Sequence, residues 1–375
     1  MMHQWEEFKA SMPHQQFPYL KRNWGSPLHS VCSYQAKMKP SLAHHLVEVF
    51  SKPGDVVLDP FSGSGTIPFE ASLTGRKGLG MDISLLSTAI SNAKLMRASP
   101  AKVEAVINNL AEWIKTQKPS TKTIAEADEV KFNGPLKEYF HSDTFTEILN
   151  AREYFASQYD GSAEYSLVMA CMLHILHGNR PYALSRNSHP ITPYAPTGGF
   201  EYKSVIEKLS TKVGKSLDSQ SPHGFIEGKC YKADICKPWP ADLININAII
   251  TSPPFFDSTK FYMTNWMRFW FCGWSKEEFT TEPESFVEVA QKKSLDVYSG
   301  IFSQCKERLV SGGLVVLHLG ISHKCDMGTS LSEIAKDYFD ILDLYTESVE
   351  HCESHGIRDK GSVTGHQYLI LQKPT

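Results

Sequence analysis

Two short segments combine residues that can hold a ligand and align a reacting group. The first is Asp59-Pro-Phe-Ser-Gly-Ser-Gly-Thr66, whose glycines let the backbone approach a ligand closely. The second is Thr251-Ser-Pro-Pro-Phe-Phe256, which two prolines stiffen. In it the Ser252 hydroxyl and the Pro253 carbonyl are fixed hydrogen-bond acceptors, and Phe255 presents an aromatic ring. Two such acceptors can draw an amino group on a heteroaromatic ring toward tetrahedral geometry while the phenyl ring stacks on that base.

The glycine segment lies inside a pattern that predicts a strand, a loop, a helix and a second strand. The strands are residues 55–59 and 78–82, and helical character resumes at residues 68–74. Ligands of open parallel sheets bind beyond the carboxyl ends of the strands. Asp82, at the end of the second strand, can accept hydrogen bonds from both hydroxyls of a ribose. The lysine of a phosphate-binding GxxxxGK[ST] loop is absent, which argues against a phosphate site here. The other alternative is a tight turn without a ligand.

The rest of the chain predicts a larger sheet that a helical region interrupts. An apolar strand at residues 248–251 precedes the second segment, and further strands are expected at 228–234, 313–319 and 365–371. Residues 116–225 differ, because a polar stretch and helices lead into the Pro- and Gly-rich run from 180 to 199. Such a loop inside a compact enzyme is more often functional than not.

Composition narrows the class of protein. With 375 residues, 41% hydrophobic and 21% charged, the chain can bury the core of one large α/β domain plus an insertion. It has no apolar run of about 20 residues and no signal-peptide pattern at its start, so we expect a soluble, cytoplasmic protein without membrane contact. Its eight cysteines form no Cys-x-x-Cys pair, which predicts reduced thiols and no metal site.

The net charge of −3 argues against a protein that coats nucleic acid through bulk charge, but one region is locally basic. Residues 176–216 carry six Lys or Arg against two Glu, with aromatic residues between them. This mixture suits phosphate contact and base stacking, although an ordinary solvated helix face is the alternative after Glu201. The candidates for nucleic-acid contact are Arg180, Arg186, Lys203, Lys260 and Arg268.

The aromatic run at residues 257–274 has two interpretations. It can wall the pocket for a flipped base, because a target amino group inside a duplex is unreachable until its nucleotide is extruded. The interpretation as core is favoured for Trp266, Phe269 and Trp270.

The pair DPFSGSG and TSPPF resembles the cofactor and catalytic motifs of the DNA amino-methyltransferases. The resemblance implies an α/β fold, a Rossmann-like sheet of the S-adenosylmethionine-dependent methyltransferases, here with a largely helical insertion. It implies catalytic roles for Ser252, Pro253, Pro254 and Phe255. The segment 33–40 is similar to the family segment at the methionine part of the cofactor, and Asp234 matches the acid that meets its adenine. The implied cofactor-binding residues are Tyr34, Lys39, Asp59, Pro60, Phe61, Gly63, Gly65, Thr66, Asp82, Ile83 and Asp234.

The Ser-Pro-Pro-aromatic form resembles the branch that methylates cytosine N4, whereas adenine-N6 enzymes more often carry Asp or Asn at the position of Ser252. An adenine-N6 enzyme, an RNA enzyme such as one for guanine N2 of tRNA, and a non-catalytic nucleic-acid-binding protein are the alternatives. Cytosine-C5 enzymes match poorly because they need a Pro-Cys nucleophile, and the chain has no Pro-Cys dipeptide. The implied partner is DNA, and a cognate restriction endonuclease can accompany such an enzyme in restriction-modification.

The order of motifs departs from the family's common layouts, because about 130 residues separate the second-strand acid from the third-strand acid. We therefore predict three parts. They are an N-terminal arm with the first half of the methyltransferase domain at 1–98, a helical insertion and candidate target-recognition region at 99–225, and the second half of the domain with the catalytic loop at 226–375.

Overall fold

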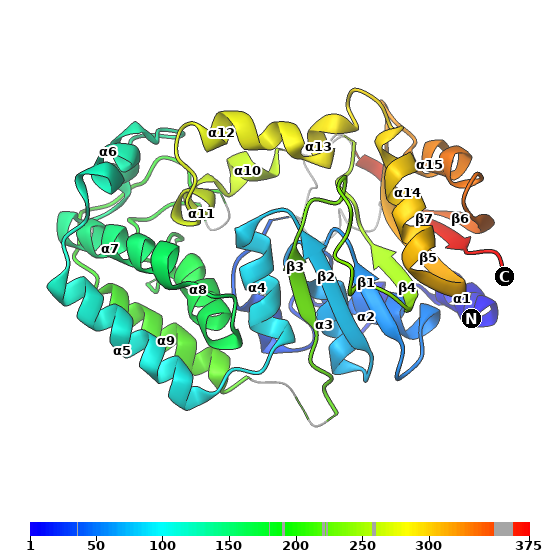
Figure 1. Cartoon of the computed structure of the whole chain (residues 1–375), viewed down its shortest axis with the longest axis horizontal. Coiled ribbons are helices and arrows are strands. Elements are labelled where there is room, and N and C mark those ends of the chain that lie inside the picture. Colours follow the sequence, from blue (N-terminus) through cyan, green and yellow to red (C-terminus); the bar gives the residue numbers. More distant parts are fainter. Residues whose placement is uncertain are drawn as a thin grey trace.

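A seven-stranded sheet forms the centre of the larger part of the molecule (Figure 1). The computed structural model describes residues 1–35, 37–179, 181–189, 192–219, 222, 224–256, 260–348 and 363–375. The strand order is β3-β2-β1-β4-β5-β7-β6. The strands are β1 Val56–Asp59, β2 Lys77–Asp82, β3 Lys229–Lys232, β4 Ile246–Thr251, β5 Leu309–Ser322, β6 Asp340–Ser348 and β7 Val363–Gln372.

The pairing of the strands confirms the expected Rossmann-like methyltransferase sheet. Strands β1 to β5 pair in parallel, with Leu58 opposite both Leu79 and Ile249, and only β7 runs antiparallel, between β5 and β6. A parallel sheet must be covered on both faces, which explains why β1, β4 and the middle of β5 are almost continuously apolar. Because β1 and β4 are parallel neighbours, the loops that follow Asp59 and Thr251 emerge at one edge of the sheet.

Alternate residues of each strand face the two helical layers, as the two-residue period of a strand requires. Val57, Ala248 and Val316 pack against α1, α2 and α3, whereas Leu58 and Ile249 pack against α14 and α15 on the opposite face. The helices of these layers are α1 Met2–Ser11, α2 Pro40–Phe50, α3 Thr66–Leu73, α4 Leu85–Leu95, α14 Val297–Arg308 and α15 Met327–Ala335.

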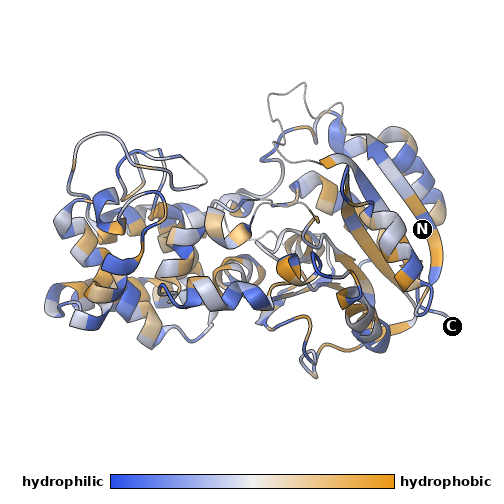
Figure 2. Ribbon diagram, turned by 90° about the horizontal axis from the view of Figure 1, so that it is seen from above, coloured by the Kyte–Doolittle hydropathy of each residue, from blue (hydrophilic) through white to orange (hydrophobic). Residues whose placement is uncertain are grey.

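A second core lies in a helical lobe, to the left of the sheet in Figure 1. It joins the five helices of the insertion to α11, which follows the catalytic loop, and to one face of α4. Figure 2 shows the hydrophobic residues of this lobe on the inner sides of its helices. The helices of the lobe are α5 Pro100–Thr116, α6 Thr121–Glu129, α7 Ser142–Gln158, α8 Ala163–Ile175, α9 Val205–Leu217 and α11 Trp266–Phe271.

Short helices connect the lobe to the sheet along the top of Figure 1. They are α10 Phe261–Thr264, α12 Glu278–Thr281 and α13 Val287–Ala290, with a 3-10 turn at Glu282–Ser285. Three further 3-10 turns lie elsewhere in the chain, at Pro13–Gln15, Pro27–Ser30 and Leu136–Tyr139. Across the described ranges, every helix is too short or too polar to cross a membrane.

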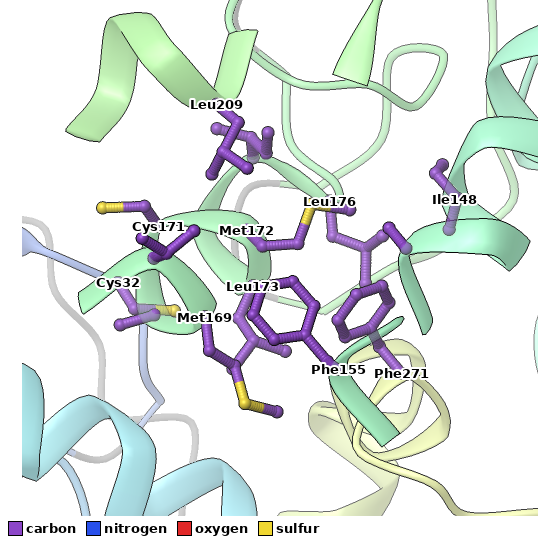
Figure 3. Close-up of a cluster of buried hydrophobic side chains, with 14 of the residues drawn as sticks. Cys32, Ile148, Phe155, Met169, Cys171, Met172, Leu173, Leu176, Leu209 and Phe271 are labelled. Atoms are coloured by element: carbon purple, nitrogen blue, oxygen red, sulfur yellow. The ribbon is translucent and has the colours of Figure 1, made fainter. Parts of the chain in front are cut away.

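The packing of α11 ties the segment after the catalytic loop to the insertion. Trp266, Phe269 and Trp270 are at most 1% exposed, so the interpretation of these aromatics as core is confirmed. Phe271 packs edge-on against Phe155 of α7, with ring centroids 5.9 Å apart, in the cluster that Figure 3 shows. The helical core therefore includes residues from the predicted second half of the domain as well as from the 99–225 insertion.

This packing predicts that Phe271→Ala destabilises the protein by about 3–5 kcal/mol, because it leaves a cavity between α7 and α11. Urea unfolding followed by circular dichroism measures the change. Met263→Ala, at a side chain of α10 that is 44% exposed, is the control and should cost less than about 1 kcal/mol. If both variants lose the same small amount of unfolding free energy, α11 is not part of the helical core.

Candidate active site at the carboxyl edge of the sheet

The loop between β1 and α3 has a shape that only glycine allows at two positions. Gly63 and Gly65 have φ angles of 50° and 70°, in the left-handed region. A Cβ atom on Gly65 would also lie 2.6 Å from Ser91 Oγ, so the bare backbone of the loop packs directly on α4. Ser91 Oγ in turn donates a hydrogen bond of 3.0 Å to the Gly63 carbonyl. The loop is therefore a rigid cradle at the carboxyl end of β1.

Asp82 closes this cradle from the neighbouring strand. Its Oδ2 accepts the Gly63 amide at 3.0 Å, and its Oδ1 accepts the Ser84 amide and hydroxyl at 2.9 and 3.0 Å. Burial raises the pKa of Asp82, and these hydrogen bonds oppose that shift. A carboxylate has about four lone-pair sites. The half-buried Asp82 thus keeps acceptor capacity for the hydroxyls of a ligand.

The N-terminal arm contributes Tyr34, whose hydroxyl is 2.8 Å from Ser87 Oγ on α4. The ring lies where a side chain on Gly63 would project, because a Cβ there would be 3.3 Å from the Tyr34 hydroxyl. Phe261 of α10 packs on the same ring, with centroids 4.8 Å apart. The arm and the segment after the catalytic loop therefore meet beside the glycine loop. Lys39 lies farther along the arm and donates to the His14 carbonyl.

The other residues predicted for cofactor binding lie on the same edge or beside it. Asp234 follows β3, is half-buried, and accepts the Cys236 amide at 2.9 Å. Strand β3 pairs with β2, so Asp234 follows the strand next to the one that ends at Asp82. Phe61 and Ile83 are half-buried, whereas Pro60 and Thr66 are buried in the loop and in the first turn of α3. The roles of these residues toward a cofactor stay predictions.

The catalytic loop after β4 is held to the glycine loop by one buried hydrogen bond. Thr251 Oγ1 donates to Asp59 Oδ1 at 2.5 Å, and the same oxygen accepts the Phe61 amide at 3.1 Å. Asp59 is 3% exposed, and burial raises its pKa to about 7 against the effect of these two donors. The last residues of β1 and β4 thus form one polar unit beneath both loops.

Two residues that the sequence did not single out hold the catalytic loop from other elements. His318 of β5 places Nδ1 3.2 Å from Ser252 Oγ. Gln291, which follows α13, donates from Nε2 to the Pro254 carbonyl at 2.9 Å and accepts the Tyr298 hydroxyl at 2.9 Å. His318 is a lone polar residue in the apolar run of β5, a signal that could have been noticed, whereas nothing in the sequence distinguishes Gln291.

Phe255 lies with its ring against the backbone of β5. A Cβ on Gly320 would come within 2.6 Å of Phe255 Cδ2, so the ring needs the glycine opposite it. Its centroid is 5.7 Å from that of His318 and 5.9 Å from that of His366. Phe255 is half-buried, as are Ser252 and Pro254, whereas Pro253 is buried.

One of the five residues predicted for nucleic-acid contact is wrong. Arg268 is 0% exposed, and its guanidinium donates to the Leu173 carbonyl at 3.0 Å and to Asn265 Oδ1 at 3.3 Å. The guanidinium is thus surrounded by protein and cannot reach a phosphate. Arg180 lies outside the described residues, and Lys260 is exposed at the start of α10.

Arg186 and Lys203 brace the Pro-rich loop. Arg186 donates to the Gly198 and Glu138 carbonyls, at 2.6 and 2.9 Å, and its guanidinium lies 4.3 Å from the Phe200 ring centroid. Lys203 Nζ donates to the Ala183 and Ser185 carbonyls at 2.8 and 2.9 Å. In this conformation the cationic groups of both side chains therefore hydrogen-bond to backbone carbonyls of the protein.

One known protein family matches the first quarter of the chain. Residues 5–92 match the N6_N4_Mtase family model, described as DNA methylase. This segment is therefore similar to the DNA amino-methyltransferases. It contains the glycine loop and Asp82, and it ends before β3 and β4.

Two relatives are Type II methyltransferases. M.MjaII of Methanocaldococcus jannaschii is 27% identical over 119 residues, which are 32% of this chain and 22% of the relative. M.HinfI of Haemophilus influenzae is 33% identical over 104 residues, 28% of each chain. The chain thus spans about a quarter of the length of these relatives. A solved TehB-like SAM-dependent methyltransferase from Corynebacterium glutamicum is 8% identical with a TM-score of 0.35, over 99% of this chain and 95% of that one.

The methylase family of residues 5–92 supports S-adenosylmethionine as the cofactor. The carboxyl edge fits this group, since the half-buried Asp82 carboxylate at the end of β2 has acceptor capacity for ribose hydroxyls. Residues that would hold it are those of the loop from Asp59 to Thr66, with Tyr34, Asp82 and Asp234 around it.

We predict that Asp82→Asn weakens S-adenosylmethionine binding roughly 10- to 100-fold, because hydrogen bonds to a charged acceptor contribute about 1.5–3 kcal/mol. Isothermal calorimetry measures the affinity. Asp55→Asn is a matched control at the opposite end of β1, where the carboxylate accepts the Lys52 amide. An Asp82→Asn protein that folds and binds with wild-type affinity would remove Asp82 from the cofactor site.

Proposed function

We propose that this chain is an S-adenosylmethionine-dependent DNA methyltransferase that methylates the exocyclic amino group of a base, namely cytosine N4. The observation that carries the proposal is the Thr251–Asp59 hydrogen bond, which fixes the Ser-Pro-Pro-Phe loop beside the glycine cradle. A methyl donor at the cradle and a base at Ser252 would then be neighbours. The family of residues 5–92 supports DNA as the substrate.

The chemistry asked of the protein is positioning and hydrogen bonding. S-adenosylmethionine supplies an electrophilic methyl group. The amino nitrogen of a base is a poor nucleophile because its lone pair is delocalised into the ring. The Ser252 hydroxyl and the Pro253 carbonyl would accept its two protons and so localise the lone pair on nitrogen, which lowers the barrier most in the transition state. The rigidity that Gln291 gives to the loop would keep these acceptors aligned.

The choice of cytosine rests on Ser252. A hydroxyl in this position resembles the cytosine-N4 branch, as the sequence indicates. The same pair of acceptors can serve the N6 amino group of adenine or the N2 amino group of guanine in tRNA, so these bases are the alternatives. In a restriction-modification pair, a cognate restriction endonuclease would be a further partner of the protein.

Methyl transfer from labelled S-adenosylmethionine to duplex DNA, single-stranded DNA and tRNA tests the proposal, and Ser252→Ala is the decisive variant. We expect transfer to DNA, and a loss of about 100-fold or more in rate for Ser252→Ala with nearly unchanged cofactor affinity. Ser258→Ala serves as a control substitution of the same kind nearby in the chain. Transfer to tRNA alone would replace DNA with RNA, and full activity in Ser252→Ala would contradict the mechanism.

We further propose that the Pro-rich loop, residues 181–189 and 192–204, contacts nucleic acid mainly through aromatic rings. Tyr194, Phe200 and Tyr202 are 55%, 57% and 50% exposed. The loop beneath them is fixed, because the Pro193 carbonyl accepts donors from Asn133, Tyr139 and Trp266 at 2.9, 3.2 and 3.3 Å. Rigid, exposed rings suit base stacking, which tolerates any sequence.

The loop is also joined to the cofactor side of the molecule. Thr192 Oγ1 lies 3.5 Å from Gln35 Oε1, next in sequence to Tyr34, and Trp266 belongs to the segment after the catalytic loop. Nucleic acid on this loop would therefore be close to the proposed base site. Since the cations of Arg186 and Lys203 are bound to carbonyls of the loop, Lys260 and Arg180 are the better candidates for phosphate contact.

This division of roles predicts two different responses. Tyr194→Ala should weaken DNA binding roughly 5- to 100-fold, because stacking contributes about 1–3 kcal/mol per base, while the salt dependence of binding stays constant. Lys260→Ala should instead reduce the slope of log K against log salt by about 0.9, because the protein then neutralises one phosphate fewer. Fluorescence anisotropy over a salt series measures both. Ile244→Ala, at another exposed side chain, is the control. Unchanged affinity in Tyr194→Ala would remove the loop from the interface.

A further inference from the structure

The imidazole of His318 is buried directly beneath the proposed base site. It is 7% exposed in the middle of β5, and its Nδ1 is the atom 3.2 Å from Ser252 Oγ. Its other nitrogen, Nε2, is buried and has no hydrogen-bond partner among the described residues. A buried imidazole with a single polar contact, made to the serine of the catalytic loop, requires an explanation.

The environment of His318 favours the neutral imidazole. Burial lowers its pKa well below the usual range, and the neighbouring His366 and His14 act in the same direction. Glu347 opposes them. It accepts the Tyr368 hydroxyl at 2.5 Å and lies 3.1 Å from His14 Nε2. Although burial opposes its ionisation, these contacts lower the pKa of Glu347 to about 2. The groups facing His318 are thus His366 and Tyr368 of β7, Glu347 of β6, and His14 of the N-terminal arm.

A neutral imidazole can meet Ser252 in two ways. With its proton on Nδ1 it would donate to Ser252 Oγ, and the serine proton would point elsewhere. With its proton on Nε2 it accepts the serine proton at Nδ1, and both lone pairs of Ser252 are left for other donors. Only the second arrangement makes the serine oxygen a full acceptor for an amino group.

We propose that His318 is the positioning residue of the catalytic loop, which accepts the Ser252 proton at Nδ1 and takes up, through Ser252, the proton that the methylated amine releases. This inference rests on the proposed function. Once the nitrogen has gained a methyl group, it is cationic and one N–H bond must break. The electron pair of that bond stays on nitrogen, its proton passes to Ser252 Oγ, and the original Ser252 proton passes to His318 Nδ1. The products are a neutral methylated amine and an imidazolium.

A weak base is sufficient for this step. An amino group on a heteroaromatic ring becomes a strong acid when it is protonated or methylated to a cation, so even an imidazole of lowered basicity accepts its proton. The Glu347 carboxylate, ionised by its contacts with His14 and Tyr368, is the group that favours the imidazolium while it lasts. The proton can return to solvent by way of Ser252 after the product leaves.

The hydrogen-bond direction can be measured without any substrate. In protein labelled with 15N-histidine, the nitrogen shifts of His318, assigned by their loss in His318→Asn, report which nitrogen carries the proton. We expect Nε2 protonated and Nδ1 bare, and we expect Ser252→Ala to shift the Nδ1 signal. A proton on Nδ1, or an Nδ1 chemical shift that is the same in Ser252→Ala as in the wild type, would overturn the proposal.

Rates of single-turnover methyl transfer test the chemical part. His318→Leu should slow transfer about 10- to 100-fold at unchanged S-adenosylmethionine affinity. In His318→Asn the amide oxygen can accept a hydrogen bond from Ser252 but cannot be protonated. This variant should therefore recover only part of the rate that His318→Leu loses. His177→Leu is the matched control, because His177 is a buried imidazole of the helical lobe, 1% exposed. Equal losses in His177→Leu and His318→Leu, or full activity in His318→Leu, would overturn the role.

The two proposals fail in different ways. A wild-type protein that transfers no methyl group to any nucleic acid overturns the proposed function and with it the proton transfer. A wild-type protein that is active, with a His318→Leu variant as fast as wild type, overturns only the role of His318.

Discussion

The hydrogen bond from Thr251 to Asp59 is the contact on which the active-site arrangement depends. It joins the last residue of β4 to the last residue of β1, and the parallel pairing of these strands brings their carboxyl ends together at one edge of the sheet. The carboxyl of Asp59 is almost fully buried, so leaving it without this donor would cost free energy comparable to an unsatisfied buried group. The glycine loop and the catalytic loop consequently have one fixed geometry relative to each other.

The helical lobe limits the movement of the catalytic loop from the other side. The chain leaves the loop and enters α11, whose aromatic residues are core residues of the lobe, while α4 packs on the lobe with one face and on the glycine loop with Ser91. The insertion is therefore attached to both sides of the site. This arrangement explains how an insertion placed ahead of the Asp234 strand in the sequence can still border the catalytic segment in space.

Much of the site could be predicted because its residues lie in local patterns. The strand, glycine loop, helix and strand around Asp59 and Asp82 form a continuous segment, and the Ser252 loop follows an apolar strand directly. His318 and Gln291 were missed because they lie 66 and 37 residues away from their partners in the loop, and only the sheet and α13 bring them there. Strand β6 was also missed, because its residues 340–348 mix charged, polar and apolar types without a regular two-residue period, at the edge of the sheet.

The error at Arg268 has a similar origin. Charged residues are mostly exposed, which favoured a surface role, but this guanidinium is buried, and the carbonyl of Leu173 in the last turn of α8 accepts a hydrogen bond from its Nε. Arg186 and Lys203 likewise have partners in loop carbonyls that no local pattern reveals. Side chains with a long reach are the ones whose partners the sequence predicts least.

The most direct measurement is the nucleoside composition of genomic DNA from host cells without N4-methylcytosine of their own, expressing either the wild-type protein or Ser252→Ala. Mass spectrometry of the digested DNA should reveal N4-methylcytosine with the wild type and none above background with the variant. N6-methyladenine in place of N4-methylcytosine would contradict the choice of base, and the absence of any methylated exocyclic amine would contradict the account of the site as a DNA amino-methyltransferase.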